Sequence, residues 1–277
     1  MEKITTLQFY YYGMDIMNFV KKYIDITEMQ ERYKNTSYLL TNKEINEYKI
    51  TENNIIKVKV TKDSGVTVIP LAITNKGFAI VNPVCYVRNI PEDQESVKNL
   101  MFHELIHVGS ITQKIDDKNQ LIRLSGINKM VFSLDYKDLD LDYKYLNEAM
   151  TELIAKFIYD KLYDDTYKIV KLTEDMVISS GYAKNYFLLA FLLLNYFEDH
   201  PDVLFNIYFN NNIELFEKVL EENTNFTLKK LNKLMNELQE NPNGIWINLK
   251  YARIMKKIYS KNPIRNKEVI YEYNHKN

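Results

Sequence analysis

The feature that most constrains the fold is a change in hydrophobic periodicity along the chain. Between residues 55 and 81, apolar and polar residues alternate in short runs separated by turn residues, a pattern typical of β-strands. From residue 173 onward, apolar residues recur at helical spacing almost to the last residue. Strands and helices gathered in different parts of one chain predict an α+β fold: a small mixed β-sheet first, then a mostly helical C-terminal lobe.

The same patterns predict individual elements. Strands are expected at 55–60, 66–73 and 78–81, a helix from Pro91 to about 108 with Gly109 at its end, and a second helix over about 146–162. Residues 121–134 predict a short irregular or β segment, and the first 50 residues fit no single pattern. In the C-terminal part, helices are expected at about 174–198, 202–209, 212–222, 227–240 and 245–260. These elements predict two domains, an α+β lobe at 1–135 and a helical lobe at 136–277.

Composition and charge narrow the classes of partner. Among the 277 residues, 36 Lys and Arg oppose 37 Asp and Glu, so no global positive field attracts nucleic acid, and we expect no nucleic-acid partner. No apolar run approaches the roughly 20 residues that span a bilayer, and the first residues do not resemble a signal peptide. The sequence therefore predicts a soluble, cytoplasmic protein with no membrane partner.

The most informative motif is the pentapeptide His103-Glu104-Leu105-Ile106-His107, inside the first predicted helix. At about 100° per residue, His107 lies about 40° around the helix from His103, so both imidazoles can bind one metal ion while Glu104 reaches a water molecule beside it. The chain has only 4 His in 277 residues, and chance gives roughly 0.004 such motifs in a chain of this composition. The spacing therefore indicates a zinc site.

A catalytic zinc site of this type needs a third protein ligand and one open position. About 40 residues downstream, the run Asn147-Glu148-Ala149-Met150-Thr151-Glu152 places two carboxylates at positions i and i+4 of the second predicted helix. Helix geometry alone allows either Glu148 or Glu152 to complete the site.

Other potential ligands are less well placed. Asp116 and Asp117 are possible but lie in a polar, loop-like run, His200 precedes a proline at a helix end, and His275 lies in a polar tail. A motif with a third histidine six residues after the second would need His at position 113, where the chain has Gln113.

The two motifs together resemble those of the gluzincins, the thermolysin-like zinc metallopeptidases, whose second motif reads Asn-Glu-x-x-Ser-Asp. The resemblance implies that His103, His107 and Glu148 bind Zn²⁺ and that Glu104 is the general base. It also implies that Glu152, in the place of the family's aspartate, orients the imidazole of His103 without itself binding the metal. The chain departs from the family by having Thr and Glu at the last two motif positions, and by a longer gap between the motifs.

Gluzincins also use a side chain to stabilise the oxyanion of the tetrahedral intermediate. The family resemblance suggests a tyrosine or histidine, and we expect Tyr182 to serve, with Tyr143 and Tyr145 as rivals.

The expected function is zinc-dependent hydrolysis of a peptide or protein substrate. One alternative is a catalytically silent zincin-like binding protein, and another is a regulatory zinc protein associated with DNA. The intact Glu104 argues against the first, since a purely structural zinc site does not need that carboxylate. The lack of a basic stripe in the sequence argues against the second.

Overall fold

A computed structural model describes residues 5–41, 45–51, 55–61, 65–69, 71–74, 77–88, 94–133, 143–163 and 181–261. Within these residues the fold is mixed α+β, as predicted, with small sheets and with more residues in helices than in strands. The chain divides into two compact units, Met1–Asp142 and Tyr143–Asn277. The division predicted after residue 135 lies outside the described residues.

The described strands of the first unit form three small sheets instead of the single one expected. The orders are β1-β7-β4, β3-β2-β5-β6 and β10-β9-β8. The first two sheets are mixed, because β1 is parallel to β7 and β2 is parallel to β5, whereas the remaining pairs are antiparallel. The strands are β1 (Ser37–Thr41), β2 (Ile45–Thr51), β3 (Ile55–Thr61), β4 (Gly65–Val68), β5 (Leu71–Thr74), β6 (Gly77–Ala79), β7 (Val84–Arg88), β8 (Thr112–Ile115), β9 (Leu121–Ser125) and β10 (Asn128–Phe132).

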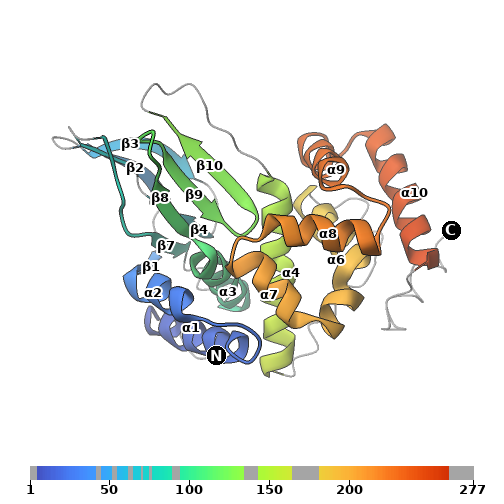
Figure 1. The fold of residues 1–277 in the computed structure, drawn as a ribbon, viewed down its shortest axis with the longest axis horizontal. Coiled ribbons are helices and arrows are strands. Elements are labelled where there is room, and N and C mark those ends of the chain that lie inside the picture. Colours follow the sequence, from blue (N-terminus) through green and yellow to red (C-terminus); the bar gives the residue numbers. More distant parts are fainter. Residues whose placement is uncertain are drawn as a thin grey trace. The chain divides into compact units, whose positions relative to one another are not determined.

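Helix α3 (Gln94–Ser110) is the centre of this unit. The helices α1 (Leu7–Val20) and α2 (Thr27–Asn35) contact it, and so do β4, β7 and β9 (Figure 1). Apolar side chains of α1 and α3 fill the space between these elements, and the rings of Tyr12 and Phe102 lie 5.7 Å apart. Burial of this apolar surface is the main favourable term that fixes α3 in the unit.

The second unit is helical in its described residues. Its helices are α4 (Lys144–Tyr163), α6 (Gly181–Asp199), α7 (Pro201–Phe209), α8 (Ile213–Asn223), α9 (Leu228–Glu240) and α10 (Ile245–Lys261). The longest apolar run of the sequence belongs to α6, where residues 186–194 are all buried, and this helix contacts the other five. In the described part of the chain, no helix has both the length and the apolar character needed to cross a membrane.

Most predicted helices of the second unit match the observed ones within one or two residues. Local signals explain the agreement: Pro201 stands at the first position of α7, and the side chains of Asn212 and Thr227 accept hydrogen bonds from the first turns of α8 and α9. Helix α6 begins at Gly181, and the predicted helical residues 174–180 lie outside the described residues.

The first unit shows where local patterns fail. Helices α1 and α2 and strands β1, β2, β7 and β8 were not predicted, and the predicted strand at 66–73 is two strands, β4 and β5, in different sheets. Helix α3 also continues one residue beyond Gly109, to Ser110. The extension is explained by anchors at this end: Arg32 donates to the carbonyl of Gly109, and the backbone N–H of Gly126 donates to the hydroxyl of Ser110. The predicted helix start at Pro91 lies outside the described residues.

Candidate metal centre

The polar motif of α3 is buried together with its apolar support. His103, Glu104 and His107 have 8%, 5% and 8% of their surface exposed. The apolar residues between and before them, Met101, Phe102, Leu105 and Ile106, are almost completely buried. The ring centroids of the two histidines lie 5.0 Å apart, with the ring planes inclined by 72°. The i, i+4 spacing therefore brings both imidazoles to one side of α3.

Two hydrogen bonds from α2 hold the helix that carries this motif. The hydroxyl of Tyr33 donates to the backbone carbonyl of Leu105 over 2.8 Å, in the buried interior. The guanidinium of Arg32 donates to the carbonyl of Gly109 over 2.8 Å. Since Leu105 lies between the two histidines in sequence, α2 fixes the turn of α3 from which both imidazoles project.

The carboxylate of Glu104 lies against strand β4. The hydroxyl of Thr67 is 2.7 Å from Oε2 of Glu104, and 3.2 Å from its backbone carbonyl oxygen. A methyl group added at Gly65 would lie 3.0 Å from Oε1 and 3.1 Å from Cγ of Glu104. Gly65 and Thr67 are two residues apart on one strand, so they share a face of the sheet, and Glu104 occupies that face.

The only cysteine lies next to this contact. Cys85 of β7 pairs with Thr67 of β4 in the antiparallel register, and it is completely buried. Burial, and then the negative charge of Glu104, raise the pKa of the Cys85 thiol well above its ordinary value, while a hydrogen bond with Thr67 lowers it. The net direction is upward, so Cys85 is a protonated thiol at neutral pH.

The far end of β4 is held by Arg123 of β9. Its guanidinium donates to the carbonyl of Ile69 over 2.8 Å and lies 5.0 Å from the ring centroid of Phe132. Burial lowers the pKa of Arg123 to about 10. The group is thus a buried cation at neutral pH that joins two sheets, and it fixes the strand on which Thr67 lies.

In the second unit, the Asn147–Glu152 run forms the first turns of α4. Asn147 and Thr151 are buried, and Glu148 is half-buried. The hydroxyl of Thr151 donates to the carbonyl of Asn147. It also forms a short hydrogen bond with the hydroxyl of Tyr208 in α7, in which either hydroxyl can be the donor. The turn that carries Glu148 is therefore anchored to the helical core.

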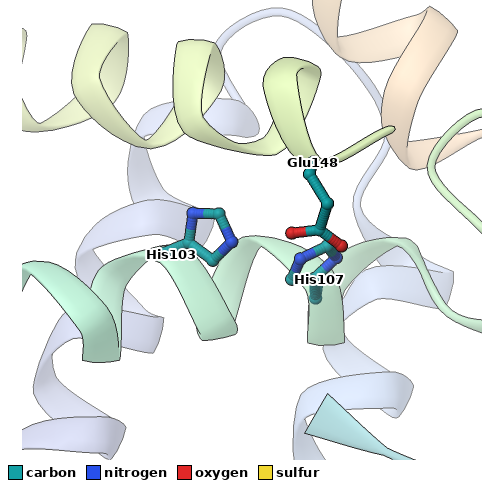
Figure 2. A group of neighbouring side chains, drawn as sticks. All are labelled: His103, His107 and Glu148. Carbon is teal, nitrogen blue, oxygen red and sulfur yellow. The ribbon is translucent and has the colours of Figure 1, made fainter. Parts of the chain in front are cut away.

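His103, His107 and Glu148 form the group of side chains drawn in Figure 2. Each residue offers one ligand atom, an imidazole nitrogen or a carboxylate oxygen, and these atoms all lie within 4.8 Å of one another. Two imidazoles and one carboxylate are a donor set that catalytic zinc sites use, with a further position left for water or substrate. The chemistry of these donors thus fits the metal that the sequence predicts.

The remaining predicted residues have other surroundings. Glu152 pairs with Lys156 one turn along α4, with 2.9 Å between Oε1 and Nζ. Its predicted role in orienting His103 stays a prediction. Tyr182 lies in the first turn of α6, and its side chain is outside the described residues. Its rival Tyr143 precedes α4 with a left-handed backbone, φ 69°, and its carbonyl accepts a hydrogen bond from the backbone N–H of Asn147.

The alternative ligands also have defined places. Asp116 accepts hydrogen bonds from the backbone N–H groups of Lys118 and Gln120, which makes it the residue that closes the turn between β8 and β9. His200 is exposed at the residue preceding α7. His275 lies outside the described residues.

Sequence reasoning did not identify Gly65, Thr67 and Cys85 as neighbours of the motif. In the sequence, Gly65 ends the turn-like run Asp63-Ser64-Gly65, and Thr67 lies in the predicted strand at 66–73. No local pattern indicates their proximity to Glu104, because the contact joins residues 37 positions apart.

Comparison with models of protein families, with curated proteins and with solved structures finds no match to this chain. The geometry of the described residues is therefore the basis for inferring function.

Proposed function

We propose that the chain is a zinc-dependent peptide hydrolase, with His103, His107 and Glu148 as metal ligands and Glu104 as general base. The observation that carries the proposal is the group of three ligand atoms within 4.8 Å of one another, with the carboxylate of Glu104 on the same helical turn as both imidazoles. The gluzincin-like order of the two motifs supports the same assignment.

The chemistry divides between the metal and the chain. Zinc, when bound, supplies a Lewis acid that polarises a carbonyl and lowers the pKa of water to about 7. Glu104 is the buried carboxylate next to the ligands, and it accepts the proton of the attacking water as the water oxygen bonds to the carbonyl carbon. It then donates that proton to the leaving nitrogen as the C–N bond breaks, so the carboxylate returns to its starting charge.

The surroundings of Glu104 suit this role. Glu104 is a buried residue, so its carboxylate meets little competing solvent, and its hydrogen bond with Thr67 limits the directions in which it can point. A purely structural zinc site has no use for a buried carboxylate beside its ligands, which favours hydrolysis over the silent binding protein.

The test is cleavage of a broad peptide library by the purified full-length chain, followed by mass spectrometry. We expect defined cleavage products with the zinc-loaded protein, their loss after chelation, and their return when zinc is restored. Glu217→Gln on α8 is the matched surface control for Glu104→Gln, since Glu217 is exposed and lies in the other unit from Glu104. Tight binding of one zinc ion per chain without any cleavage would instead identify the silent binding protein.

A further inference from the structure

We propose that Thr67 of β4 is a positioning residue for Glu104: its hydroxyl holds the carboxylate in the orientation that proton transfer requires. The inference rests on the proposed function, and it adds a residue to which neither sequence motif points. Thr67 would touch neither substrate nor metal, and would act only through Glu104.

The first observation is that the Thr67 hydroxyl, which also forms a hydrogen bond with the thiol of Cys85, lies within hydrogen-bond distance of two oxygens of Glu104. The Cys85 sulfur is only a weak acceptor, so the two oxygens compete for the hydroxyl hydrogen. The hydroxyl oxygen is 2.7 Å from Oε2 of Glu104 and 3.2 Å from the backbone carbonyl oxygen of the same residue. A hydroxyl has one hydrogen to donate, and a charged acceptor at the shorter distance gives the stronger bond. The hydroxyl therefore donates mainly to the carboxylate of Glu104. Its contact with the backbone carbonyl of Glu104, which would hold α3 against β4, is the weaker one.

The second observation is the absence of a side chain at Gly65, two residues earlier on the same face of β4. The position that a Cβ atom would take is 3.0 Å from Oε1 and 3.1 Å from Cγ of Glu104, closer than nearly all real contacts of such an atom. A side chain at position 65 would therefore crowd Oε1 and Cγ of Glu104, while Thr67 donates a hydrogen bond to Oε2. The glycine thus leaves room for the carboxylate beside β4, and the threonine binds it there.

The third observation is that β4 is itself held, along one edge by β7 and at its far end by Arg123. Cys85 of the central strand β7 is completely buried and pairs with Thr67, and Arg123 donates to the carbonyl of Ile69 just after the strand. A group on a well-supported strand can hold a reacting carboxylate within the few tenths of an ångström that proton transfer needs.

The experiment compares Thr67→Val, Thr67→Ser and Gly65→Ala with the zinc-loaded wild type on a peptide that the wild type cleaves. Valine has the shape of threonine without the hydroxyl, so we expect kcat to fall about tenfold or more while KM stays within about twofold. Serine keeps the hydroxyl and should restore kcat to within about threefold. Alanine at position 65 pushes the carboxylate away from β4 and should also lower kcat about tenfold.

A second readout does not depend on turnover. In metal-free protein labelled with ¹³C at the glutamate carboxyl carbons, the signal of Glu104 is assigned by its loss in Glu104→Gln, at one fixed pH. We expect this signal to move in Thr67→Val and to return close to the wild-type position in Thr67→Ser. Urea unfolding of each variant verifies that all are folded.

The results separate this inference from the proposed function. If the wild type cleaves peptides and Thr67→Val keeps the wild-type kcat, the positioning role is overturned. It is also overturned if the ¹³C chemical shift of the Glu104 carboxyl is the same in Thr67→Val and in the wild type. A kcat loss that Thr67→Ser does not restore also overturns it, because the effect would then come from packing. A zinc-loaded wild type without any cleavage refutes the proposed function and with it the catalytic value of Thr67, whereas the carboxyl signal still reports the contact itself.

Discussion

The assignment of the third ligand makes a quantitative prediction about two glutamates on one helix. Glu148 belongs to the group of three ligand atoms, whereas Glu152, one turn further along α4, pairs with Lys156 at 2.9 Å. Zinc bound to four protein ligands gains about 10–16 kcal/mol, so one ligand accounts for about 2.5–4 kcal/mol. Glu148→Ala should therefore weaken zinc binding by two to three orders of magnitude, at about 1.4 kcal/mol per factor of ten.

Glu152→Ala is the matched comparison, because it removes the same side chain from the same helix. If Glu152 only orients a ligand, its loss should cost about 10–100-fold in zinc affinity or in activity. The side chains of Glu152 and Lys156 are mostly buried, with 20% and 15% of their surface exposed, so losing this ion pair should cost more stability than the about 0–1 kcal/mol of an exposed pair. The zinc affinity of each variant is therefore compared only after its fold has been verified.

The assay is a competition titration of each variant with a chromophoric zinc chelator, with circular dichroism to verify the fold. We expect a weaker zinc affinity in Glu148→Ala than in Glu152→Ala, by about tenfold at the midpoints of the two ranges. If Glu152→Ala loses the metal while Glu148→Ala keeps it, the two roles are reversed. If both keep wild-type affinity, the third ligand lies elsewhere and the proposed site is wrong.

Two further predictions concern the support of α3. Gly13→Ala on α1 would place a methyl group 2.9 Å from the ring of Tyr33, whose hydroxyl donates to the carbonyl of Leu105. Overpacking costs about 1–3 kcal/mol, and alanine regains up to about 1 kcal/mol of helix propensity. We therefore expect the free energy of unfolding, measured in urea, to fall by about 1–2 kcal/mol. An unchanged or higher stability would mean that the ring of Tyr33 moves freely. The second prediction concerns the thiol of Cys85, which is completely buried and has a raised pKa. It should not react with a chromogenic thiol reagent in native protein at pH 8 but should react fully in denaturant, which absorbance follows. Rapid reaction of the native protein would show that β7 is accessible to solvent.

The helices of the second unit were readable from the sequence because each carries its own signals. Thr227 begins α9 with a side-chain cap, and buried leucines follow at helical spacing, at positions 228, 231, 234 and 238. Such information is local, so no knowledge of distant residues is needed. The apolar run of α6 likewise predicted a buried helix from its own residues alone.

The first unit depends on pairings between distant residues, which local patterns do not contain. Strand β1 is parallel to β7, with Tyr38 opposite Cys85, and a parallel pair needs a long connection between its strands. Helix α1 begins at Leu7, and the preceding Thr6 makes no side-chain hydrogen bond that caps it. Its pattern is also weak because four of its large apolar residues are exposed, namely Leu7, Tyr10, Tyr11 and Met14. These segments become helix or strand through tertiary packing.

The candidate site shows the same division. Spacing within one helix predicted His103, Glu104 and His107, whereas the second helical motif allowed either Glu148 or Glu152 and the gluzincin resemblance favoured Glu148. His103, His107 and Glu148 are the residues whose ligand atoms lie together. The partners of Glu104 on β4 could not be found in this way, because a threonine and a glycine in a short strand are ordinary residues until the fold brings α3 against them.

The most direct test of the central claim is the rate of peptide cleavage by Glu104→Gln at equal zinc content. The glutamine keeps the size of the side chain and leaves all three ligand atoms in place, so the variant should bind zinc like the wild type. Because it cannot accept the proton of the attacking water, cleavage of the same peptide should fall by at least about 100-fold. Wild-type turnover in the zinc-loaded variant would contradict the account and remove Glu104 from the mechanism.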